Sequence, residues 1–97
     1  MDEYSYFRGM ADTETTEKTR KRLIFRSEHR GTKEMDLLMG SFARKYVPEF
    51  NEEELAQFDE ILQENDPNLY NWITGKEEAP ANVVSDVFER LKAHKYA

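Results

Sequence analysis

The stretch RGTKEMDLLMGSF, residues 30–42, decides the fold because it holds a helix break and a helix start side by side. Gly31 is a poor helix former that tolerates a left-handed backbone, so we expect it to end the preceding helix. Thr32 then caps a second helix. Four apolar residues recur at spacings of three and four and share one face of that helix: Met35, Leu38, Met39 and Phe42.

The flanking sequence predicts a longer helix on each side of this pair. A first helix is expected over residues 16–29, and the second ends near Tyr46, before Pro48. Asn51 is expected to cap a third helix, with Glu54 placed for a capping box. The inner face of the third helix is apolar and consists of Leu55, Phe58, Ile61 and Leu62.

Two shorter helices complete the predicted fold. Asp66 should cap the fourth, with Pro67 at its first position and Gly75 at its end. The fifth should start near Asn82 and bury one apolar side, formed by Val83, Val84, Val87, Phe88 and Leu91. No strand pattern competes. We therefore predict an all-α fold, a compact single-domain bundle of about five short helices.

Composition sets the domain boundaries and a first expectation of location. The 97 residues suffice for one small domain, over residues 15–97, while residues 1–14 show no helical period and predict a flexible tail. Cysteine is absent, and no apolar run is long enough to span a membrane. Because the first 18 residues resemble neither a signal peptide nor a transit peptide, we expect a bacterial cytoplasmic protein. Met10 is a second possible start, so residues 1–9 could be an extension.

Charge is distributed unevenly along the chain, whose net charge is −6. Seven of the 14 Lys and Arg residues lie within residues 18–33, whereas residues 46–75 contain neither Lys nor Arg. The basic segment could steer an acidic partner, or it could be an ordinary solvated helix face. A nucleic-acid-binding helical protein is one alternative, which the net negative charge disfavours.

Catalytic signatures are missing from the sequence. His29 and His94 are far apart in the chain, and no nucleophile motif or metal-ligand spacing occurs. We therefore predict that the protein is not an enzyme and holds no metal. Trp72, the only tryptophan, is expected to anchor the core and less readily to stack on a ligand. Arg22, Arg26 and Arg30 form a row that is either an exposed face or a stripe of donors for an acidic partner.

Two segments resemble the succinate dehydrogenase assembly factors, known also as flavinylation factors. Arg30, Gly31 and Glu34 match the RGxxE signature of that family, and Asp36 and Leu37 follow where the family commonly has an acid and a leucine. The second segment, NDPNLYNWITG, is similar to a family segment at Asp66, Pro67, Leu69, Tyr70 and Trp72. The resemblance runs from about Thr19 to Leu91 and implies a five-helix bundle.

The resemblance also implies a function. Family members bind the flavoprotein subunit of succinate dehydrogenase, or of the related fumarate reductase, and promote covalent attachment of FAD to a histidine of that client. The resemblance thus implies a protein with no tightly bound cofactor, which acts on the FAD of its client. It is expected to be a monomer when free, without nucleic acid and without membrane insertion. A small adaptor of the antitoxin type is the other alternative.

The resemblance predicts a client-binding surface at the turn between the first two helices. The predicted residues are Arg26, His29, Arg30, Gly31, Glu34 and Asp36. Gly31 would let a client approach closely, while Arg30 would hold a client carboxylate or carbonyl groups. A purely structural interpretation also stands. In it, Glu34 complements the dipole of its own helix and Arg30 the C-terminal end of a neighbouring helix.

Overall fold

The computed structural model describes residues 15–95, and over this range it contains α-helices and one short 3-10 helix. The elements are α1 (Thr16–Glu28), α2 (Lys33–Tyr46), η1 (Val47–Glu49), α3 (Glu52–Leu62), α4 (Asp66–Ile73) and α5 (Asp86–Ala93). The five described α-helices confirm the predicted all-α bundle of short helices. The predicted tail, residues 1–14, and the last two residues lie outside the described range.

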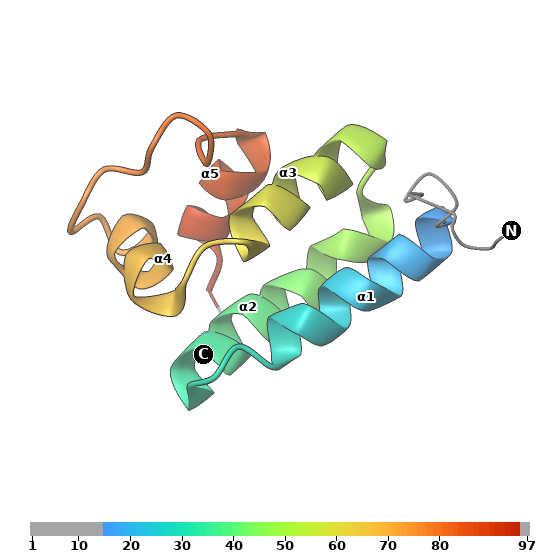
Figure 1. Cartoon of the computed structure of the whole chain (residues 1–97), viewed down its shortest axis with the longest axis horizontal. Helices are drawn as coiled ribbons and strands as arrows, with labels where there is room; N and C mark the ends of the chain where they lie inside the picture. The colour runs from blue at the N-terminus through green and yellow to red at the C-terminus, as the bar shows by residue number, and fades with distance from the viewer. Residues whose placement is uncertain (1–14, 96–97) are drawn as a thin grey trace, which may run out of the picture.

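The helices form a bundle in which α1 and α2 lie side by side and antiparallel (Figure 1). Helix α3 packs on α1 and α5, so one core runs through the bundle. Phe42 of α2, Phe58 of α3 and Phe50 between them meet in this core, with ring centroids 5.5–6.2 Å apart. Such aromatic contacts add to the stabilisation from apolar burial. No helix within residues 15–95 is long and apolar enough to cross a lipid bilayer.

Helix α2 is built as the sequence predicts. Thr32 is its N-cap, and the Thr32 hydroxyl accepts a hydrogen bond from Met35 N at 3.2 Å. The predicted inner face is buried at every position, namely Met35, Leu38, Met39 and Phe42. Residue type at the cap therefore located the start of α2, and periodicity located its packing surface.

Helix α3 begins with the predicted capping box. Asn51 Oδ1 accepts from Glu54 N at 2.8 Å, and Glu54 Oε1 accepts from Asn51 N at 2.9 Å. These reciprocal bonds satisfy two backbone donors that the helix itself leaves without partners. They fix the position at which the chain enters α3.

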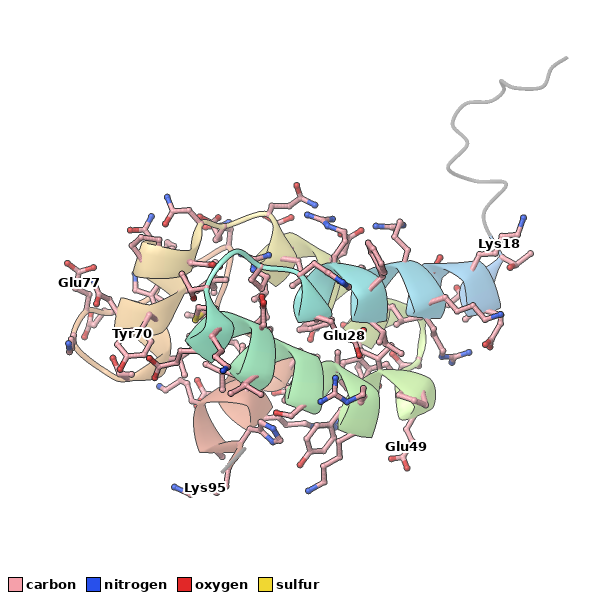
Figure 2. The ribbon with its side chains drawn as sticks, turned by 90° about the horizontal axis from the view of Figure 1, so that it is seen from below. Lys18, Glu28, Glu49, Tyr70, Glu77 and Lys95 are labelled. Atoms are coloured by element: carbon pink, nitrogen blue, oxygen red, sulfur yellow. The ribbon has the colours of Figure 1, made fainter. Side chains whose placement is uncertain are left out.

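A close contact sets the distance between α1 and α2. Gly40 of α2 is buried, and a Cβ atom added there would lie 3.1 Å from Glu28 Cγ on α1. The Glu28 carboxylate accepts a hydrogen bond from Arg44 Nη1 at 2.7 Å, one helical turn beyond Gly40. Figure 2 shows Glu28 on α1 above the ribbon of α2.

Three predicted helix boundaries need correction. Helix α1 ends at Glu28, with His29 as its C-cap, so Gly31 lies in the following turn, where its φ of +133° is in the region that favours glycine. Helix α4 is capped by Asn65, whose side chain accepts from Asn68 N, and not by Asp66. Asn65 and Asp66 are both good capping residues, so local preference could not separate them.

Helix α5 also starts later than predicted, at Asp86 and not near Asn82. Ser85 caps it by accepting a hydrogen bond from Phe88 N at 3.1 Å. Val83 is buried in the turn before the helix, whereas Val84 is 54% exposed, so the prediction that both valines lie on an inner helix face is wrong for Val84. Trp72, the predicted anchor of α4, is half-buried against the core.

Candidate functional site

The turn between α1 and α2 is held together by one carboxylate. Asp36 Oδ1 accepts hydrogen bonds from the backbone N–H groups of Arg30 and Gly31, the second at 3.2 Å. An acid in the first turn of α2 also complements the helix dipole. Asp36, predicted as a client-binding residue, therefore has a structural partner in the turn itself.

Arg30 links this turn to the turn between α3 and α4. Its Nε donates to Asp66 Oδ1 at 2.8 Å. Its Nη1 donates to the carbonyl of Leu62 at 3.0 Å, and its Nη2 to the carbonyl of Glu64 at 2.6 Å. The Leu62 carbonyl lies at the C-terminal end of α3, where helix carbonyls lack partners within the helix, and the Glu64 carbonyl lies in the turn that follows. Only 9% of the Arg30 side chain is exposed, so the contacts support the structural interpretation of this residue.

Gly31 lies at the surface of the same turn. A Cβ atom added there would have one neighbour within 4 Å, Asp66 Oδ2 at 3.8 Å. Space is therefore available at this position, and the positive φ is the reason for glycine. A side chain at position 31 would project above Asp66, where it would obstruct any partner that approached the turn.

A hollow of about 390 Å³ opens beside this turn. It lies between the first turn of α2 and helix α4, and Figure 2 shows Tyr70 on α4 beside the start of α2. The lining residues are Thr32, Glu34, Met35, Asp66, Pro67 and Tyr70. We call this the motif hollow, because each of these residues comes from one of the two segments that carried the family resemblance. Its apolar walls and two carboxylates suit a ligand with both apolar and donor groups.

The structure divides the predicted site residues into two groups. Arg30, Gly31 and Asp36 meet in the turn beside the motif hollow, and Glu34, which is exposed, lines the hollow itself. Five residues that line the hollow together with Glu34 were not predicted as site residues: Thr32, Met35, Asp66, Pro67 and Tyr70. Their signal in the sequence was the second resembling segment, which contains Pro67 and Tyr70.

Arg26 and His29, by contrast, do not line the hollow. Arg26 pairs with Asp59 at 3.4 Å and donates to the carbonyl of Leu62 at 3.3 Å, which ties α1 to α3. His29 Nδ1 donates to the carbonyl of Phe25 at 2.7 Å, and the two rings stack with centroids 4.1 Å apart. Both residues thus take part in local contacts of α1.

The arginine row formed by Arg22 and Arg26 of α1 and Arg30 of the following turn contacts the rest of the bundle. Arg22 and Arg26 both pair with Asp59, at 3.5 and 3.4 Å, while Arg30 pairs with Asp66. The sequence suggested either an exposed helix face or a stripe of donors for an acidic partner. The ion pairs within the bundle match neither interpretation. Within residues 15–95, no group of three or more His, Asp or Glu side chains is placed to hold a metal ion.

Comparison with known proteins places these motifs in a family. Residues 21–95 match the family described as the flavinator of succinate dehydrogenase. Among similar proteins, the mitochondrial succinate dehydrogenase assembly factor 2 of Drosophila grimshawi is 40% identical over 77 residues, which cover 77% of this chain and 52% of that protein. The assembly factor 2 of Dictyostelium discoideum, also mitochondrial, is 38% identical over 78 residues, covering 80% and 55%. The chain spans about half the length of these relatives.

The comparisons correct one prediction and confirm another. The relatives are eukaryotic proteins named as mitochondrial, and this contradicts the prediction of a bacterial cytoplasmic protein. The composition of the first 18 residues was insufficient to predict location. The resemblance noted in the two segments is confirmed, because the family match covers both of them. The chain therefore belongs to the family of succinate dehydrogenase flavinators.

Proposed function

We propose that this protein is an assembly factor that binds the flavoprotein subunit of succinate dehydrogenase, or of fumarate reductase, and promotes covalent attachment of FAD to it. Membership of the flavinator family supports this function, as do relatives named succinate dehydrogenase assembly factor 2. The observation that carries the proposal is the motif hollow. Both family segments meet there, joined by the ion pair of Arg30 and Asp66.

The motif hollow is the surface that we assign to the client. Met35, Pro67 and Tyr70 give it apolar walls, and Met35 can adapt its shape to a partner. Glu34 gives it negative charge, and Asp66 adds a second carboxylate, whose Oδ1 is paired with Arg30. A client side chain with an apolar stem and a cationic end, such as Arg or Lys, matches this combination.

In this proposal the factor works by positioning. The reacting groups, a histidine and the flavin, belong to the client, and the factor holds a client conformation in which they meet. Holding reactants in a productive geometry can supply a large part of a rate enhancement. Arg30 then acts as a positioning residue, because its three donors fix α2 relative to α4 and so keep the hollow open.

The contacts that the arginines make within the bundle argue against the alternative that this protein binds nucleic acid. Affinity for nucleic acid depends on cationic groups that can reach phosphates. Arg20 donates to the carbonyls of Val47 and Phe50, and three more arginines of the basic segment pair with Asp59 or Asp66. Four of the seven basic residues counted in residues 18–33 are thus engaged within the bundle.

The test uses the full chain carrying an affinity tag and a lysate that contains succinate dehydrogenase. Captured protein is separated under denaturing conditions and examined for flavin fluorescence in the gel, since only covalent flavin remains attached. We expect a fluorescent band of the size of the flavoprotein subunit, and a weaker band with Glu34→Ala. Glu53→Ala is the matched control, because Glu53 is an exposed acid on α3 that does not line the hollow. The proposal would be contradicted if the captured proteins included no flavoprotein, or if the fluorescent band weakened equally in both variants.

A further inference from the structure

A second depression lies on the other side of α4. It has a volume of about 410 Å³ and is bounded by the end of α4, the loop over residues 74–85, and α5. The residues that define it here are Trp72, Glu77, Glu78, Val84, Phe88 and Glu89, with Lys92 at its edge. We call it the acidic groove. It shares no lining residue with the motif hollow. Helix α4 contributes Pro67 and Tyr70 to the motif hollow and Trp72 to the acidic groove.

The loop that forms one wall of the groove is held in place at several points. The backbone N–H groups of Lys76 and Glu77 both donate to the carbonyl of Asn71, at 2.9 and 3.2 Å. Further along, Asn82 Nδ2 donates to Glu60 Oε2 at 3.0 Å, and Val83 is buried in the core. The groove is therefore largely formed before any partner binds, which reduces the entropy cost of binding.

The base of the groove is apolar. Trp72 packs against the core but is only half-buried, while Phe88 is almost fully buried beneath the groove. Val84 is 54% exposed at its edge and is one of the few large apolar side chains on the described surface. Trp72 and Val84 line the same groove and together provide an apolar contact surface for a partner.

The rim of the groove is negatively charged. Glu77 and Glu78 form no ion pair with any of residues 15–95. Glu89 has a long contact of 3.9 Å with Lys92, whose ammonium lies 5.8 Å from the centre of the Phe88 ring. Three carboxylates thus face one ammonium. Figure 2 shows Glu77 at the end of the molecule opposite Lys18, far from the basic start of α1.

We propose that the acidic groove binds a basic segment of a partner protein, in which an Arg or Lys side chain stands next to an aliphatic one. The cation would lie over the face of Trp72 and pair with Glu77 or Glu78, while the aliphatic side chain contacts Val84. A guanidinium suits the site best, because it is planar and can stack on the indole while it binds a carboxylate. This inference is independent of the proposed function, because it requires no flavoprotein.

The single tryptophan makes the groove directly measurable, since all indole fluorescence of the chain comes from Trp72. The probe is the peptide acetyl-Leu-Arg-Leu-Arg-amide, titrated into the full chain at low ionic strength. We expect a saturable change in Trp72 emission that weakens as salt is added. The matched peptide with Glu in place of Arg should cause no change. In the double variant Glu77→Gln/Glu78→Gln, we expect binding of the Arg peptide to weaken by about fivefold or more.

Control variants separate this groove from general charge attraction. Glu52→Gln/Glu53→Gln removes the same charge from exposed positions on α3 and should leave the affinity unchanged. Equal weakening in both double variants would overturn the proposal, as would a lack of any saturable change. A further outcome would also overturn it. If Trp72 emission changed with protein concentration alone and the peptide had no effect, the occupant would be a second copy of this chain.

Discussion

Arg30 and Asp66 form an ion pair at 2.8 Å between residues that are 36 positions apart in the chain. The two side chains are only 9% and 16% exposed, so the pair is shielded from water. Each residue belongs to one of the two segments that identify the family, and the pair makes them one structural unit. Arg30 also binds the carbonyl of Leu62 at the end of α3 and that of Glu64 in the next turn, so a single side chain connects the α1–α2 turn to α3 and α4.

The first prediction concerns the stability that this pair provides. Arg30→Ala leaves the Asp66 carboxylate and two carbonyls without their donor, and removing one partner of a buried pair typically costs about 3–5 kcal/mol. We expect the free energy of unfolding to fall by this amount in urea denaturation. Arg30→Lys should cost less, because an ammonium keeps the charge but cannot reach all three acceptors. A loss below about 1 kcal/mol in Arg30→Ala would mean that the pair behaves like an exposed one.

The second prediction concerns the core. Phe58 is fully buried and contacts the rings of Phe42 and Phe50. Phe58→Ala should therefore cost about 3–5 kcal/mol through lost burial and the cavity that remains. The change should lower both the unfolding midpoint in urea and the melting temperature. A melting temperature within a degree or two of the unchanged protein would refute the assignment of the inner face of α3.

The third prediction concerns Gly31 and client flavinylation. Gly31→Arg places a side chain where φ is +133°, at a cost of about 1–3 kcal/mol, which a domain of ordinary stability survives. The guanidinium would project over the turn beside the motif hollow, so covalent flavin on the client should be lost. The measurement is client flavin in cells that lack the native factor, with circular dichroism of the variant.

Gly75 supplies the control for backbone strain. Its φ is +84°, and nothing lies within 4 Å of a Cβ atom added there. Gly75→Arg therefore introduces the same side chain at another position of positive φ, which lines the acidic groove and lies away from the motif hollow. It should retain flavinylation. A folded Gly31→Arg protein that flavinylates the client fully would refute the role assigned to this turn.

The fourth prediction concerns pH. His94 Nε2 lies 2.9 Å from Ser41 Oγ, and burial, with a smaller contribution from the charge of Lys45, lowers the pKa of His94 below 6.5. Between the lowered pKa of His94 in the folded protein and its ordinary value of 6.5 in the unfolded chain, the unfolded chain binds more protons than the folded one. The contribution of His94 to stability is thus fully present above pH 6.5 and is lost as the pH falls through that window.

The measurement is urea denaturation at about pH 5 and about pH 7.5. His94→Gln cannot be protonated in this range, so the difference in unfolding free energy between it and the unchanged protein should depend on pH. The unchanged protein should lose more stability on acidification. Parallel losses in both proteins would show that other groups account for the pH dependence.

Local signals predicted most of the fold. The caps at Thr32 and Asn51 and the inner face of α2 follow from residue type and spacing alone. Predictions were wrong at the start of α5, where residues 82–85 precede the helix, and at the cap of α4, where two neighbouring residues could perform the same local task. Asn65 and Asp66 both cap well, and tertiary contact decided between them, because Asp66 binds Arg30.

The candidate site was predicted less completely, for a related reason. The sequence identified Arg30, Gly31 and Glu34 through their motif, and it left the Arg30 guanidinium either to a client or to the C-terminal end of a neighbouring helix. Its acceptors lie on α3, on α4 and in the turn between them, more than 30 residues away, and no local pattern identifies these particular partners. The motif hollow likewise depends on how α4 packs beside α2, so Met35 and Tyr70 could not be recognised as neighbours before the fold was known.

The contact between Gly40 and Glu28 gives the first two helices a fixed mutual register. Gly40 admits the Glu28 side chain, and Arg44 holds the Glu28 carboxylate from the next turn. Glu28 stands two residues before Arg30, so the rotation of α1 at this contact sets the direction from which Arg30 reaches Asp66. A methyl group at position 40 would push against Glu28 and change the position of α1 relative to α2 near the residue that leads to Arg30. We therefore expect a larger residue at position 40 to alter the motif hollow, although Gly40 does not line it.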